Sequence, residues 1–163
     1  MILGDPIIRE NLKRFLTLRQ PAPKIVFEEF GVNNGRAIAD VVALYKYAHC
    51  FEIKSDKDKL QRVLDQSRFF DQTFSKLTLV TTNKFAEKAI KLLPSYWGIL
   101  VASSNNNGIT FKYLKGANFN PVWNSKKSLL SLWKSEIINI GNNLNCPGLK
   151  DRLSLSGNNG TIH

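Results

Sequence analysis

The chain has 163 residues, of which 43% are apolar, and it carries a formal net charge of +10 at pH 7. This length and apolar content are enough for one compact domain with a hydrophobic core. The sequence contains no run of about eighteen apolar residues and no signal-peptide pattern at its start, so neither a membrane span nor secretion is predicted. Cys50 and Cys146 have no Cys or His at zinc-ligand spacing. We therefore expect a cytoplasmic protein with reduced thiols and no membrane partner.

The charges are unevenly distributed along the chain. Residues 1–24 carry five Lys and Arg against two acids, and residues 112–152 carry seven against two. Residues 25–59 hold six of the thirteen acids: Glu28, Glu29, Asp40, Glu52, Asp56 and Asp58. A basic surface attracts phosphate backbones, and clustered carboxylates bind hard cations. The distribution predicts a nucleic-acid partner and a site for a divalent cation, although many basic proteins bind neither.

Hydrophobic periodicity and turn residues predict four helices and six strands. Helices are expected over residues 7–19, 58–74, 84–93 and 126–144. Strands are expected over residues 24–30, 38–45, 50–54, 77–81, 97–102 and 109–114, with residues 46–49 as the loop between the second and third strands.

The order of these elements predicts the fold class. A meander of strands followed by helical crossovers indicates an α/β fold with a mixed central β-sheet and helices on both faces. No linker divides the chain, and Pro, Gly, Ser and Asn dominate its end. We therefore expect a single domain over residues 1–153 and a flexible tail over residues 154–163.

The second and third strands bring three charged residues together. If their turn centres on Lys46, Asp40 lies opposite Glu52, and Glu52 and Lys54 share a face. Two neighbouring carboxylates repel each other, and a charge within the apolar run around Asp40 is costly. A bound Mg²⁺ would resolve both problems. The alternative is a buried ion pair of Asp40 with Lys54 or Arg36.

Asp40 followed by Glu52-Ile53-Lys54 resembles the D…(D/E)-x-K signature of the PD-(D/E)XK nuclease superfamily. Over roughly residues 25–153 the chain is similar to a family of small, mostly uncharacterised bacterial and phage proteins within that superfamily. The similarity rests mainly on Glu29-Phe30-Gly31, Phe51-Glu52-Ile53-Lys54-Ser55-Asp56, Pro94-Ser95-Tyr96-Trp97-Gly98-Ile99 and Leu132-Trp133-Lys134-Ser135-Glu136. The resemblance implies a restriction-endonuclease-like core.

The resemblance also implies roles for the residues of the signature. Asp40 and Glu52 would bind Mg²⁺, for which Mn²⁺ could substitute, with the backbone carbonyl of Ile53 as a third ligand. Lys54 would orient or help to deprotonate the attacking water, or stabilise charge on the phosphate. Glu29 would be an upstream acid in the metal or water shell. Glu28 is its rival, because a one-residue shift in register exchanges their faces.

A second motif follows on the predicted helix. Gln66-Ser67-Arg68-Phe69-Phe70 resembles the Gln-x-x-x-Tyr motif of related nucleases, with Phe70 in place of Tyr, and implies a catalytic role for Gln66. Asp58, Arg62 and Gln66 would share one helix face at i,i+4 spacing, which could also be an ordinary solvated face. Phosphate contacts are expected from four basic residues: Arg36, Arg62, Lys126 and Lys127.

Together these features predict a metal-dependent nuclease that hydrolyses phosphodiester bonds, of DNA in preference to RNA. Bound Mg²⁺ can activate water and neutralise charge on the scissile phosphate. One alternative is a catalytically inactive DNA-binding or regulatory subunit with the same fold. Another is a toxin or anti-phage effector nuclease. The aromatic residues of the C-terminal third also suggest a homodimer.

Overall fold

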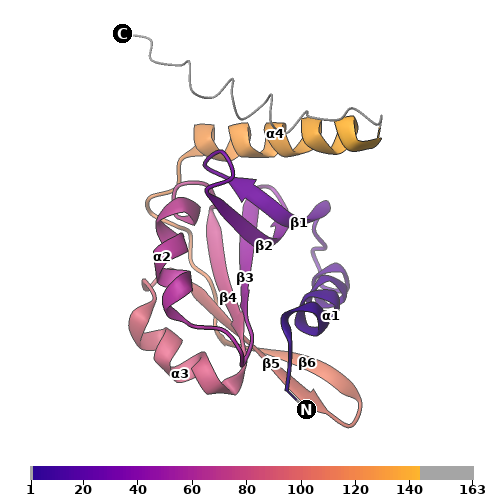
Figure 1. Ribbon diagram of the computed structural model, residues 1–163, viewed down its shortest axis with the longest axis vertical. Helices are drawn as coiled ribbons and strands as arrows, with labels where there is room; N and C mark the ends of the chain where they lie inside the picture. Colours follow the sequence, from indigo (N-terminus) through magenta and orange to yellow (C-terminus); the bar gives the residue numbers. More distant parts are fainter. Residues whose placement is uncertain (1, 144–163) are drawn as a thin grey trace.

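A computed structural model describes residues 2–143 of the chain (Figure 1). Its elements are α1 (Asp5–Thr17), β1 (Ile25–Val32), β2 (Ala37–Leu44), β3 (Ala48–Lys54), α2 (Gln61–Phe70), β4 (Lys76–Thr81), α3 (Asn83–Leu92), β5 (Gly98–Asn105), β6 (Gly108–Lys115) and α4 (Ser125–Asn143). Every predicted helix and strand is present, and most ends differ by only a few residues. The expected flexible tail over residues 154–163 lies outside the described residues.

The six strands form one sheet whose spatial order follows the chain, β1-β2-β3-β4-β5-β6. The pairs β1–β2, β2–β3 and β5–β6 are antiparallel, whereas β3–β4 and β4–β5 are parallel. Parallel neighbours need a crossover connection, and α2 and α3 provide these two crossovers. The predicted mixed sheet is therefore confirmed.

Helix α1 covers one face of the sheet (Figure 1). Its buried residues Ile8, Leu12 and Leu16 repeat at helical spacing. They pack with Phe51 and Ile53 of β3 in one hydrophobic cluster. This contact places the polar border of α1 beside the central strands of the sheet.

Helices α2 and α3 cover the opposite face (Figure 1). Val63 and Phe70 of α2 and Ala86 and Ala89 of α3 are buried there, in a second cluster that includes Cys50 of β3. The α/β class with helices on both faces of a mixed sheet is thus confirmed. The restriction-endonuclease-like core remains a prediction from the resemblance.

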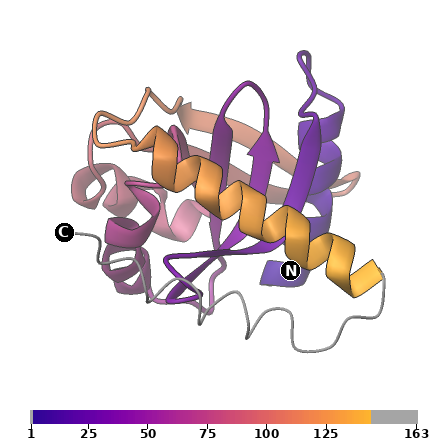
Figure 2. The ribbon, with the colours of Figure 1, turned by 90° about the horizontal axis from the view of Figure 1, so that it is seen from above.

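Helix α4 lies across the end of the sheet that carries β1 and β2 (Figure 2). It is tied to the β1–β2 turn by Lys134, whose Nζ donates to Asn34 Oδ1 over 2.7 Å. Leu129, Leu130 and Trp133 of this helix remain exposed. The homodimer stays a prediction. Within residues 2–143, none of the helices has the length and apolar character needed to cross a membrane.

The β2–β3 hairpin is tighter than predicted. Residue 48 already belongs to β3, so His49 lies in the strand and not in the loop. Its ring stacks on Phe51 with centroids 4.2 Å apart, and its Nε2 lies 2.8 Å from Thr78 Oγ1. Burial, assisted by the charge of Lys76, lowers the pKa of His49 to about 3. His49 is therefore a neutral part of the sheet at physiological pH.

Candidate active site

Asp40 lies where β2 and β3 separate. The antiparallel ladder runs from Leu44 opposite Ala48 to Val41 opposite Phe51. Continued by one residue, this register sets Asp40 opposite Glu52, as the predicted turn requires. Beyond the last ladder pair, the carboxylate of Asp40 accepts a hydrogen bond from the backbone of β3, because the amide of Ile53 donates to Asp40 Oδ2 over 2.8 Å. The side chain of Asp40 is thereby held beside β3.

Glu52 and Lys54 form a buried ion pair next to it. Lys54 Nζ donates to Glu52 Oε1 over 2.8 Å, and the two side chains are only 9% and 2% exposed, respectively. The second oxygen, Glu52 Oε2, is buried and has no hydrogen-bond partner within the described part of the chain. Buried acceptors are normally satisfied, so this oxygen marks a place suited to a cation or a water molecule.

Burial also changes how the two carboxyl groups titrate. It raises the pKa of Glu52 to about 7, with further contributions from the charge of Asp40 and from a hydrogen bond that the protonated Glu52 can share with Asp40, and with an opposing one from Lys54. Burial likewise raises the pKa of Asp40, opposed by the hydrogen bond from the Ile53 amide. A divalent cation between these groups would favour their ionised forms.

Arg9 of α1 is the residue of this site that the sequence interpretation missed. Its Nη2 lies 3.0 Å from Asp40 Oδ1, its Nε 3.1 Å from Asp5 Oδ1 and its Nη1 3.7 Å from Glu29 Oε1. The side chain is 17% exposed. An ion pair of Asp40 was foreseen as an alternative, but with Lys54 or Arg36. Helical spacing links Arg9 to Asp5 at i,i+4, whereas nothing in the spacing points to Asp40.

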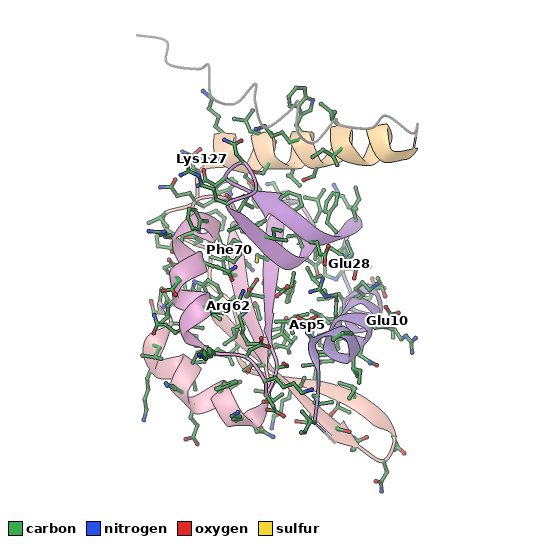
Figure 3. The ribbon with its side chains drawn as sticks, in the orientation of Figure 1. Asp5, Glu10, Glu28, Arg62, Phe70 and Lys127 are labelled. Atoms are coloured by element: carbon green, nitrogen blue, oxygen red, sulfur yellow. The ribbon has the colours of Figure 1, made fainter. Side chains whose placement is uncertain are left out.

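The backbone of β1 turns over at Glu29, which has a φ of 50°. Before it, Glu28 faces α1 and pairs with Lys13 over 3.1 Å (Figure 3). After it, Phe30 packs in the cluster beneath α2. Glu29 is linked to Asp40 through Arg9, whereas Glu28 is not; which of the two acids contributes to a metal or water shell stays a prediction. The side chain of Glu29 is 76% exposed.

The neighbouring strand β2 also changes face opposite Glu29. Glu28 pairs with Val41, and Phe30 pairs with Ala39, so Asp40 stands at the corresponding position of β2. Val41 packs on the α1 face, yet Ala39 packs on the α2 face, although residues two apart normally share a face. The change of face leaves Asp40 within reach of groups from both sides of the sheet.

The residues around Asp40 match part of what a divalent cation needs. Within residues 2–143, no three Asp, Glu, His or Cys side chains converge closely enough to hold a metal ion, so Glu29 is not brought into one ligand group with Asp40 and Glu52. Mg²⁺ is usually bound by one or two carboxylates and several waters, which Asp40 and Glu52 can satisfy. The carboxylates of Asp40 and Glu52, including the unpartnered Glu52 Oε2, therefore fit Mg²⁺. The ligand roles of Glu29 and of the Ile53 carbonyl stay predictions.

Gln66 lies on the sheet-facing side of α2, between the buried Val63 and Phe70. Its Oε1 is buried and unpartnered among the described residues, like Glu52 Oε2. Glu52 follows Cys50 by two residues and so faces the same helix layer. Two acceptor oxygens therefore remain unsatisfied between α2 and the sheet.

Phe70 and Asp58, which the sequence motifs grouped with Gln66, have structural roles. Phe70 is a core residue, with its ring centroid 6.0 Å from that of Phe74, and a tyrosine hydroxyl there would need a buried partner. Asp58 does not share a helix face with Gln66, because α2 begins only at Gln61. Instead its carboxylate accepts from the Ser55 amide over 2.8 Å and from Ser55 Oγ over 2.7 Å, which closes the turn after β3.

The four basic residues expected to contact phosphate are all exposed and come from three separate parts of the fold. Arg36 lies in the β1–β2 turn, four residues and roughly 13 Å along the strand from Asp40. Arg62 lies in the first turn of α2, and Lys126 and Lys127 lie at the start of α4 (Figure 3). Lys127 Nζ donates to Gln72 Oε1. Their contacts with nucleic acid stay predictions.

Replacing Glu29 by glycine is expected to leave the free energy of unfolding unchanged or to raise it by up to about 1 kcal/mol, because glycine adopts positive φ without steric cost. The exposed ion pair with Arg9 that is lost contributes little. Urea denaturation of Glu29→Gly and of the matched variant Glu28→Gly measures this. Glu28→Gly should instead lose about 1 kcal/mol, since it places glycine in ordinary strand. Equal losses in both variants would contradict a strained Glu29.

Fold and site together define an α/β protein with a buried Asp–Glu–Lys cluster beside a strand hairpin. The chain belongs to the family described as Bacteriophage P4 protein cII, whose sequence pattern matches residues 5–158. Protein cII of Enterobacteria phage P4 is 32% identical over 117 residues, which are 72% of this chain and 44% of that protein. The chain thus matches less than half the length of this curated relative.

A solved structure supports the fold alone. A protein of unknown function from Silicibacter pomeroyi superposes with a TM-score of 0.52 over 85% of each chain, at 17% sequence identity. At this identity the likeness concerns the arrangement of helices and strands and carries no statement about chemistry.

Proposed function

We propose that the protein is a Mg²⁺-dependent nuclease of the PD-(D/E)XK type that hydrolyses phosphodiester bonds of DNA. One observation carries the proposal: the buried, unpartnered Oε2 of Glu52, beside the carboxylate of Asp40 and the ammonium of Lys54. Two carboxylates and a lysine in one buried cluster are costly to a fold that makes no use of them. The net charge of +10 supports a polyanionic substrate.

Each residue of the cluster has a role in this proposal. Asp40 and Glu52 would hold the cation, which would supply an activated water and neutralise charge on the phosphate. Lys54 orients Glu52 through its 2.8 Å hydrogen bond and places a positive charge next to the cation site. Gln66 Oε1 offers an acceptor from α2 for a water molecule. The Ile53 amide fixes the orientation of Asp40.

The test uses the purified protein with supercoiled plasmid, linear duplex, single-stranded DNA and RNA, each with Mg²⁺, Mn²⁺ or EDTA. We expect cleavage of DNA with either metal and none with EDTA. Asp40→Asn and Glu52→Gln keep the size of the side chains and should lower the rate by at least about 10³-fold, whereas the exposed-site control Glu87→Gln should not. The absence of cleavage of every substrate, or equal cleavage by the variants, would refute the proposal.

A second candidate is a DNA-binding or regulatory subunit that does not cut. The ion pair between Arg9 and Asp40 favours it, because this guanidinium neutralises Asp40 without any metal. Such a protein would bind duplex DNA in a gel-shift assay but would show no heat of Mn²⁺ binding in calorimetry. A nuclease would show both. The family supports a phage context, and a toxin or anti-phage effector role remains a prediction.

A further inference from the structure

Arg9 connects three carboxylates that belong to three different elements. It pairs with Asp5 of its own helix α1, with Glu29 of β1 and with Asp40 of β2, at 3.1, 3.7 and 3.0 Å. Figure 3 shows Asp5 at the start of α1, on the side of that helix nearest the central strands. With Glu52 beside Asp40, four carboxyl groups surround two cations, Arg9 and Lys54. The cluster therefore contains more carboxyl groups than basic side chains.

The position of Arg9 conflicts with a metal ion on Asp40. Asp40 Oδ2 is taken by the Ile53 amide, and Oδ1 faces the Nη2 of Arg9. A divalent cation bound through Oδ1 would lie close to a guanidinium that is largely shielded from solvent. Like charges a few ångströms apart repel strongly in such surroundings. Each oxygen keeps a second lone pair, so a cation and Arg9 compete for Asp40 through the repulsion between their charges.

We propose that Arg9 is a built-in counter-ion which a divalent cation must displace from Asp40, so that Arg9 sets the cation concentration at which the site is loaded. The inference rests on the proposed function, because it assumes that Asp40 is a metal ligand. Displacement is feasible since Arg9 keeps its Nε contact with Asp5 on the same helix, and Glu29 lies beside its other nitrogen. The guanidinium can swing from Asp40 while two carboxylates still balance its charge.

Lys54 does not compete in the same way. Its ammonium binds Glu52 Oε1 and leaves Glu52 Oε2 without a partner. A cation can therefore reach Glu52 without breaking the Lys54 contact, whereas at Asp40 Oδ1 it would lie next to the guanidinium of Arg9. The two basic residues of the cluster thus have different functions: Lys54 orients a ligand, and Arg9 blocks one.

The test is titration of the full chain with Mn²⁺ alone, by calorimetry, for the wild type and three variants. Arg9→Gln removes the competing charge and should tighten Mn²⁺ binding by about tenfold or more. Arg9→Lys keeps the charge but not the fork that contacts three carboxylates, so its affinity for Mn²⁺ should lie between those of the wild type and Arg9→Gln. Arg14→Gln is the matched control, because Arg14 is an exposed arginine of the same helix and should leave affinity unchanged.

A measurement on the wild type covers the case in which Arg9→Gln does not fold. The ¹⁵Nε resonance of Arg9, assigned by comparison with Arg9→Lys, should shift on addition of Mg²⁺, whereas that of Arg14 should not. Unchanged Arg9 resonances in a protein that binds Mg²⁺, or equal affinities of Arg9→Gln and Arg14→Gln for Mn²⁺, would overturn this inference and leave the nuclease proposal standing. If neither the wild type nor Arg9→Gln binds Mn²⁺, both proposals fall.

Discussion

Lys54→Met is expected to lower the free energy of unfolding by about 1–2 kcal/mol at pH 8, because it leaves the buried Glu52 without its charged partner, and a carboxyl whose pKa is about 7 can then take up a proton at that cost. Both side chains are almost fully buried, and their 2.8 Å contact is the one hydrogen bond that Glu52 Oε1 makes among the described residues. Chemical denaturation at pH 8 measures the effect. At pH 6 the loss should be smaller, since Glu52 can then bind a proton.

The control removes both charges together. The double variant Glu52→Gln with Lys54→Met should recover most of the lost stability, because no uncompensated charge remains in the cluster. Lys13→Met, which breaks the more exposed ion pairs with Glu10 and Glu28, should cost much less than Lys54→Met. If the double variant is as unstable as Lys54→Met alone, the loss comes from packing and not from the charge of Glu52.

Glu52→Gln is expected to remove a fall in stability that the wild type shows between about pH 4.5 and pH 7. The pKa of Glu52 rises from 4.5 in the unfolded chain to about 7 in the fold, chiefly through burial. In this window the native state binds more protons than the unfolded state, so the free energy of unfolding decreases as the pH rises and levels off above 7. The amplitude should be on the order of 1–3 kcal/mol.

The difference between wild type and variant isolates this effect. His49 acts in the opposite direction, because its lowered pKa makes the fold less stable as the pH falls below about 6.5. That contribution is present in both proteins and cancels in the difference. Thermal unfolding of the wild type, Glu52→Gln and the exposed control Glu87→Gln from pH 4 to pH 8 gives the profiles. Parallel profiles for wild type and Glu52→Gln would contradict a raised pKa of Glu52.

The layered fold could be predicted because its signals are local. Residues Ile8, Leu12 and Leu16 show the buried side of α1 at helical spacing, and Gln61–Phe70 shows the same for α2. The register of the β2–β3 hairpin could also be predicted, since a turn centred on Lys46 gives the observed pairing of the two strands. Only the ends of elements were misjudged, as at Asp58, where a side-chain hydrogen bond to Ser55 holds the chain outside the helix.

The candidate site was predicted in part, for a physical reason. Strand alternation places Glu52 and Lys54 on one face, and their ion pair is observed. The kink at Glu29 escaped prediction, because no local pattern marks a left-handed residue there; in the fold it coincides with the packing of Phe30 and Val41 on opposite faces. Glycine or asparagine would have been the expected signal for such a backbone.

By itself, then, the sequence determined the elements and the register of β2 on β3, which sets Asp40 beside Glu52 when continued by one residue, since these depend on residues close together in the chain. Only the tertiary structure decided which cation meets Asp40. Arg9 lies 31 residues earlier and reaches Asp40 because Leu12 and its neighbours dock α1 on the sheet. Helix α1 docks on the sheet because its whole apolar side is buried there. No local sequence pattern specifies which polar residue at the edge of that side will face which strand.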